Sequence, residues 1–93
     1  MAETSTRTVT VSNRLGLHAR PAMEFVDLAS SFASDVRVRR TDGDDAVDGK
    51  SIMQMMMLAA TKGTVLEIDC KGDDAAEASG ALVKLIESGF HED

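Results

Sequence analysis

Two spacings of apolar residues alternate along the chain, and their order limits the folds that it can adopt. Segments 7–12, 35–40 and 64–71 alternate polar and apolar residues, which is typical of half-buried strands. Segment 19–31 and the stripe over 75–86 repeat apolar residues at the spacing of a helix face. The chain therefore predicts strands and helices that each bury one face in a shared core.

A hairpin and a short helix complete the predicted order. Turn-forming residues 41–45 separate the strand 35–40 from a short returning strand at 46–47. Ser51 is a suitable N-cap for a helix that ends near Leu58. The resulting order, βαββαβα, favours an α+β domain in which helices cover one face of a mainly antiparallel sheet.

The length and the charge of the chain narrow the possible functions. With 93 residues it has the size of one domain, and we expect residues 1–93 to form it, with 1–5 and 90–93 loose. The net charge of −6 argues against a sequence-independent grip on nucleic acid, which needs clustered Lys and Arg. No apolar run has the length of a signal peptide or a membrane span, so we expect a cytoplasmic protein. Cys70, the only cysteine, cannot form an internal disulfide, and its place in a strand predicts a small buried hydrophobe.

The segment 16–22, with the sequence Gly-Leu-His-Ala-Arg-Pro-Ala, carries the best candidates for chemistry. It places His18 and Arg20 where a loop gives way to a helix, and Pro21 fits only the first turn of that helix. The first amides of a helix lack intrahelical partners and carry the positive end of its dipole, so they favour a phosphate. An imidazole there can act as a nucleophile, and Arg20 can contact phosphate oxygens through its planar fork. The other histidine, His91, lies in an acidic tail, and we expect it to be solvated and without a role.

Two separate segments resemble the HPr family, the histidine-containing phosphocarriers of the bacterial phosphoenolpyruvate-dependent sugar phosphotransferase system. Residues 17–22, Leu-His-Ala-Arg-Pro-Ala, resemble the phosphohistidine signature of that family. Residues 49–53, Gly-Lys-Ser-Ile-Met, resemble its regulatory serine segment. The element order agrees as well, so the resemblance covers nearly the whole chain. It implies an open-faced β-sandwich, in which a four-stranded antiparallel sheet carries three helices on one face.

The resemblance implies a phosphocarrier and not an independent enzyme. His18 would accept a phosphoryl group on Nδ1 from phosphorylated enzyme I and pass it to sugar-specific acceptor proteins of the EIIA type, while Arg20 stabilises the phosphate. The resemblance implies no organic cofactor and no metal, and a protein that works as a monomer. Ser51 resembles the serine that a bifunctional HPr kinase/phosphorylase modifies in some relatives, and the same residue can also serve as a plain helix cap.

The segment 52–57 is rich in methionine, and these side chains cannot all face inward on one helix. Some must enter the core, while the remainder would make an exposed, adaptable patch. The resemblance places this helix beside His18 as a contact surface for partners, with Ile52, Met53 and Met56 as our candidates for the contact. Gln54 departs from the small residue often found in serine-regulated relatives, which leaves recognition by the kinase open.

Three alternatives compete with this function. An HPr paralogue of a nitrogen-related or purely regulatory phosphorelay would use the same His18 chemistry. A nucleotide-binding loop could end in the Gly-Lys-Ser of the segment Gly43 to Ser51, but five residues separate its two glycines where the phosphate loop has four, and three of the five are Asp. A metal site in the acidic segment 42–48 would miss the spacing of an EF-hand, so a solvated acidic turn is the better interpretation.

Overall fold

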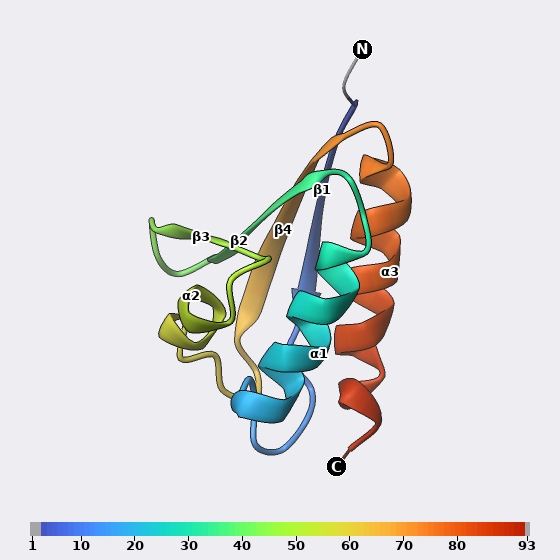
Figure 1. The fold of residues 1–93 in the computed structure, drawn as a ribbon. Helices are drawn as coiled ribbons and strands as arrows, with labels where there is room; N and C mark the ends of the chain where they lie inside the picture. The colour runs from blue at the N-terminus through green and yellow to red at the C-terminus, as the bar shows by residue number, and fades with distance from the viewer. Residues whose placement is uncertain (1–2, 93) are drawn as a thin grey trace.

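The computed structural model describes residues 3–92 and arranges them as a sheet with helices packed on it (Figure 1). The predicted order βαββαβα is confirmed, and a short 3₁₀ turn follows it. In chain order the elements are β1 (Glu3–Thr10), α1 (Ala19–Ser30), β2 (Asp35–Arg40), β3 (Ala46–Asp48), α2 (Ile52–Met57), β4 (Val65–Gly72), α3 (Ala75–Glu87) and η1 (Gly89–His91).

Residues 3–92 form one four-stranded antiparallel sheet in the order β1-β4-β2-β3. β4 is an inner strand because it pairs with β1 on one side and with β2 on the other. Its alternation explains this place, since Leu66, Ile68 and Cys70 are fully buried while Glu67 and Asp69 point to the opposite face. Cys70 is thus the small buried hydrophobe that the sequence predicts, and burial raises the pKa of its thiol to about 11.

The helices cover one face of the sheet, which confirms the predicted open-faced α+β sandwich (Figure 1). α3 packs against β1 and β4, α1 packs between α3 and α2, and α2 contacts β3. Phe25, Met55 and Leu82, one from each helix, are fully buried in a core that they share with the apolar faces of the strands. No helix within residues 3–92 combines the length and the hydropathy that a transmembrane span needs.

At both ends of residues 3–92 the structure is more regular than predicted. Residues 3–5 belong to β1 because they pair with the end of β4, and the Ser5 hydroxyl lies 2.7 Å from that of Ser79. At the other end, η1 places Phe90 in the core with 2% of its surface exposed. The predictions of loose ends are therefore wrong for residues 3–5 and for Phe90, while residues 1, 2 and 93 lie outside the described part.

Asp74 stands at the N-cap position of α3, but its side chain makes no capping hydrogen bond to that helix. The carboxylate instead accepts hydrogen bonds from the backbone N–H groups of Ala33 and Ser34, at 2.8 and 2.9 Å. The Ser34 hydroxyl donates to it as well, and this hydrogen bond, followed by those of the amides, lowers the pKa of Asp74. Asp74 therefore ties the turn before α3 to the turn after α1.

Candidate functional site

His18 stands at the N-cap of α1, as the sequence predicts, and the loop before it fixes its backbone. The Leu17 N–H donates to the carbonyl oxygen of Ala60 at 2.8 Å, and the Leu17 side chain is buried. Gly16 has a φ of +67°, and a Cβ at this position would lie 2.4 Å from the same Ala60 oxygen. Position 16 therefore requires glycine, both for its conformation and for the close approach of segment 59–61.

The first turn of α1 leaves backbone N–H groups without intrahelical partners beside His18. The Ala22 N–H donates to the His18 carbonyl at 3.1 Å, and Pro21 has no backbone N–H that could donate. The amides of Ala19 and Arg20 therefore lack an acceptor in the helix, and the His18 side chain does not cap them. The first turn also holds no acidic side chain, so nothing in it offsets the positive end of the helix dipole. Such a site favours an anion.

The His18 ring is partly exposed and is held on one edge by Glu92, a residue that sequence reasoning missed. The His18 side chain is 36% exposed, and its Nε2 atom lies 2.9 Å from Oε1 of Glu92. The side-chain amide of Asn13 donates to the same oxygen at 2.9 Å. The hydrogen bond from His18, followed by the one from Asn13, lowers the pKa of Glu92. His18 and Glu92 stand 74 positions apart in the sequence, so no local pattern could have joined them.

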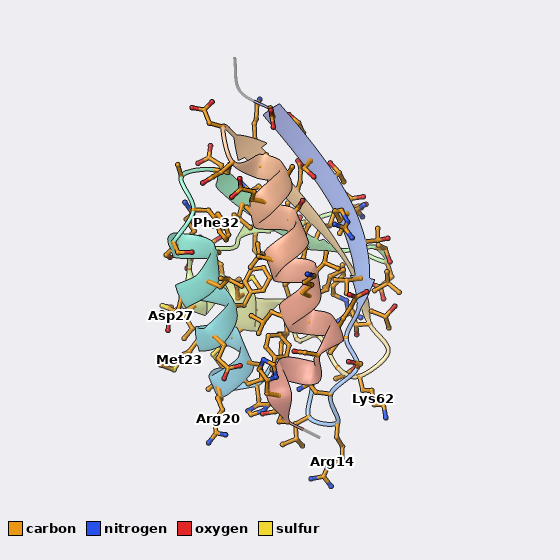
Figure 2. All side chains as sticks on the ribbon, turned by 90° about the vertical axis from the view of Figure 1, so that its right-hand side faces the viewer. Arg14, Arg20, Met23, Asp27, Phe32 and Lys62 are labelled. Carbon is orange, nitrogen blue, oxygen red and sulfur yellow. The ribbon has the colours of Figure 1, made fainter. Side chains whose placement is uncertain are left out.

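Arg20 extends into solvent from the first turn of α1, at the same end of the molecule as the labelled Arg14 (Figure 2). Within residues 3–92 its guanidinium takes part in no ion pair. Its positive charge also lowers the pKa of Glu92, but by less than the hydrogen bonds from His18 and Asn13 do. The structure thus brings Arg20 to the His18 end of α1 and leaves its planar fork available to an anion there.

Ser51 caps α2, as the sequence predicts, and lies away from His18. Its hydroxyl oxygen accepts a hydrogen bond from the Gln54 N–H at 3.3 Å. The side chain of Gln54 accepts in turn from the backbone N–H of Asp48 at 2.9 Å, which braces the segment that carries Ser51. The neighbouring Lys50 ammonium donates to the carbonyl of Phe32, just beyond the C-terminal end of α1, at 2.8 Å. The structure therefore places the serine segment beside the C-terminal part of α1, whereas His18 stands at its N-terminus.

α2 divides its apolar side chains between the core and the surface. Met55 and Leu58 are buried, and Ile52 lies half-buried on the same side of the helix. The predicted contact residues Met53 and Met56 face outward, whereas Ile52 packs against the core and offers little surface. Met57, which the sequence did not single out, is exposed. We call the exposed residues the methionine face: Met53, Met56 and Met57, with 76%, 45% and 75% of their surface exposed.

The structure argues against the nucleotide-binding loop. Residues 46–48 form β3 and pair with β2, so Gly43 and Gly49 do not flank one continuous phosphate loop. Gly49 also packs closely, since a Cβ there would lie 2.5 Å from a methyl group of Val36. In the acidic turn Asp42 pairs with Arg40, Oδ1 to Nε, at 2.9 Å. Among residues 3–92 no three His, Cys, Asp or Glu side chains gather closely enough to hold a metal ion.

Comparison with known proteins decides the family. Residues 5–88 match the family model described as the PTS HPr component phosphorylation site, where PTS is the phosphotransferase system. The chain belongs to the HPr family. It is 50% identical over 86 residues to the phosphocarrier protein HPr of Neisseria meningitidis serogroup A, which covers 92% of this chain and 94% of the relative. It is also 43% identical over 90 residues to the phosphocarrier protein NPr of Proteus mirabilis, covering 97% of this chain and 99% of that one.

A solved structure supports the same assignment for the fold. The crystal structure of HPr-C-His from Thermoanaerobacter tengcongensis has a TM-score of 0.89 and 44% identity, and the match covers 96% of this chain and 98% of that one. This HPr-family protein is therefore a phosphocarrier of the phosphotransferase system and not a catalytic enzyme. Both HPr and NPr occur among its relatives, so the family alone does not choose between a sugar relay and a nitrogen-related one.

Proposed function

We propose that this protein carries a phosphoryl group on Nδ1 of His18, which it accepts from phosphorylated enzyme I and delivers to EIIA-type acceptors. The observation that carries the proposal is a partly exposed imidazole at a helix N-terminus whose first turn holds unpartnered amides and no acidic residue. Those amides and the Arg20 guanidinium can contact the phosphoryl oxygens. Because the site lies at the exposed start of a helix, two partners can reach the ring in turn without unfolding any element.

The test is phosphorylation by enzyme I and phosphoenolpyruvate, followed by mass spectrometry under conditions that preserve phosphohistidine. We expect one added phosphoryl group, located on His18 and removed when an EIIA-type protein is added. The variant His18→Ala should stay unmodified, and the matched variant His91→Ala should be phosphorylated normally. An unmodified wild-type protein, or a phosphoryl group on His91, would refute the proposal.

A nitrogen-related or purely regulatory relay is the second candidate, and the identity with an NPr protein over nearly the whole chain favours it. The same His18 chemistry serves either relay, so the partners decide. Initial rates of phosphorylation should be compared with a sugar-type and a nitrogen-type enzyme I at equal concentrations. A preference of about tenfold or more, equal to about 1.4 kcal/mol of transition-state binding, assigns the protein to the relay of the faster donor.

We also propose that Ser51 is a target of an HPr kinase/phosphorylase. Ser51 is half-buried as a residue, and the first turn of α2 contains no acidic residue that would repel a phosphate. Gln54 departs from the family pattern, and its side chain holds this segment by accepting a hydrogen bond from the backbone N–H of Asp48. Gln54 should therefore affect how the kinase recognises the segment. Incubation with the kinase and ATP should modify the wild-type protein and not Ser51→Ala. Unmodified wild-type protein would reduce Ser51 to a helix cap.

We further propose that the protein works as a cytoplasmic monomer and that its partners dock on the methionine face and the exposed side of α1. Met23 on α1 is 52% exposed and lies on the outer side of that helix (Figure 2). Soft methionine side chains can adapt to different partners. Light scattering after size-exclusion chromatography tests the monomer. Amide shift changes on adding enzyme I test the docking surface, and changes confined to the open face of the sheet would contradict it.

A further inference from the structure

We propose that Glu92 is a positioning residue for His18, holding the ring proton on Nε2 so that the lone pair of Nδ1 is available to phosphorus. This inference rests on the proposed phosphocarrier function of His18. It adds a residue outside the 17–22 signature, contributed by the C-terminal tail.

The hydrogen-bond chemistry of the pair determines the tautomer. An ionised carboxylate can only accept hydrogen bonds, so the contact of 2.9 Å between Nε2 and Oε1 requires a proton on Nε2. In a neutral imidazole the other nitrogen then carries the lone pair. A carboxylate that fixes the tautomer and orientation of a histidine in this way is a recurrent arrangement in catalytic triads and metal sites.

The backbone conformation of the C-terminal tail positions Glu92 beside His18. Gly89, Phe90 and His91 all have positive φ, at 67°, 57° and 58°, which forms a tight left-handed turn. Non-glycine residues adopt this conformation only where the surroundings enforce it. The burial of Phe90 in the core anchors the turn, and the Glu92 N–H donates to the Gly89 carbonyl at 3.1 Å. The turn, held in spite of its backbone strain, aims one carboxylate at the His18 ring.

Asn13 connects this tail to the loop that presents His18. The residue is 1% exposed, and its side-chain amide donates both to the Gly16 carbonyl at 2.7 Å and to Glu92 at 2.9 Å. Its Oδ1 atom is buried and has no hydrogen-bond partner within residues 3–92. Asn13 is thus oriented by what its NH₂ group binds, and it donates to the same Oε1 atom of Glu92 that contacts His18. The charges that act on Glu92 come from His18 and from Arg20.

With the proton on Nε2, the transfer step balances without any proton movement. The Nδ1 lone pair forms a bond to phosphorus while the bond from phosphorus to the donor's leaving atom breaks, and that electron pair stays with the donor. A neutral ring that gains a metaphosphate-like unit becomes a cationic ring bearing a dianionic phosphoryl group. The Glu92 carboxylate stabilises the positive ring. On delivery the ring leaves as neutral imidazole, whereas a ring without the Nε2 proton would have to leave as an imidazolate anion, a far poorer leaving group.

The direct test is the tautomer of His18, read from ¹⁵N–¹H correlations of the ring at about pH 8.5, where a free imidazole is neutral. The wild-type protein should show Nε2–H as the dominant form. The variant Glu92→Gln should show a mixture, because an amide can donate to Nε2 as well as accept from it. The matched control Glu87→Gln removes the same charge from an exposed position on α3 and should leave the tautomer unchanged. A dominant Nδ1–H form in the wild-type protein would overturn the proposal without any variant.

Rapid-quench phosphotransfer from phosphorylated enzyme I supplies the second readout. We expect Glu92→Gln to lower the rate at saturating donor by roughly tenfold or more, the lower end of what loss of a histidine's carboxylate partner causes elsewhere, with little change in donor affinity. Glu87→Gln should transfer at the wild-type rate. The proposal fails if either the tautomer or the saturating rate of Glu92→Gln equals that of the wild type. Failure of the wild-type protein to accept a phosphoryl group would refute the proposed function instead.

Discussion

Replacing Gly16 by alanine should destabilise the protein by about 2–4 kcal/mol and move His18 out of place. The left-handed φ of +67° costs alanine about 1–2 kcal/mol relative to glycine. The added Cβ would lie 2.4 Å from the Ala60 carbonyl oxygen, which is part of the backbone, so the two segments must separate. Separation weakens the hydrogen bond of 2.8 Å from Leu17 to Ala60, worth about 0.5–1.5 kcal/mol, and disturbs the buried Leu17 side chain.

Gly63 provides the matched control for this substitution. It also has a left-handed φ, of +93°, but a Cβ there would meet nothing within 4 Å. Gly63→Ala should therefore lose only the conformational part, about 1–2 kcal/mol, and keep its rate of phosphoryl transfer. Urea unfolding gives both free energies, and rapid-quench transfer from enzyme I gives both rates. If Gly16→Ala is no less stable than Gly63→Ala and transfers equally fast, the close approach to Ala60 does not position His18.

Three further outcomes follow from the site and the core. Arg20→Ala should slow phosphoryl transfer by roughly 10- to 100-fold, the worth of one hydrogen bond to a charged group, with an unchanged unfolding midpoint in urea; a normal rate would remove Arg20 from the site. The hydrogen bonds from His18 to Glu92 and from Ser34 to Asp74 lower the pKa of both carboxyl groups. These two hydrogen bonds therefore stabilise the folded protein fully at a pH above the ordinary pKa values of 4.5 for Glu92 and 3.8 for Asp74. The stabilisation is lost as the pH falls through the lower pKa values of the folded state. Amide spectra of the tail and of the turn after α1 across an acid titration report both losses, and unchanged spectra down to acid unfolding would contradict them. Cys70 should resist thiol reagents near pH 8 in the folded protein and react once urea unfolds it, because burial raises its thiol pKa to about 11; rapid reaction of the native protein would contradict this burial.

The secondary structure could be predicted where its signal is local. Val36 and Val38 alternate with charged residues, and β2 covers the predicted residues 35–40. Pro21 falls in the first turn of α1, where its missing N–H leaves no helical hydrogen bond unmade. Ser51 caps α2 through its own hydroxyl and a backbone amide three residues ahead. In each case the deciding residues lie within a few positions of one another, so periodicity and capping chemistry were sufficient.

Other features depend on distant residues, and the sequence could not supply them. The polar start of β1 has no apolar alternation, and it is a strand because β4 pairs with it and Ser79 meets Ser5 from α3. Asp74 stands at the N-cap position of α3, but its carboxylate accepts hydrogen bonds from the backbone amides of the turn after α1 instead. Ile52, singled out for its neighbours in sequence, faces the core because α2 packs against α1. The pairing of β1 with β4 likewise joins two strands that are far apart in the sequence, which no local pattern specifies.

The position of Glu92 shows why a signature segment is an incomplete description of such a site. The segment 17–22 supplies the proposed nucleophile, the helix amides and the guanidinium, which together favour binding of a phosphoryl group. It does not decide which ring nitrogen of His18 carries the proton, because that depends on a carboxylate held by the tail and by Asn13. A chain with an identical signature and no acceptor at position 92 should still bind the anion but transfer it more slowly. The transfer rate therefore depends on the tail as well as on the signature segment, and a substitution at Glu92 should lower that rate without lowering the anion affinity.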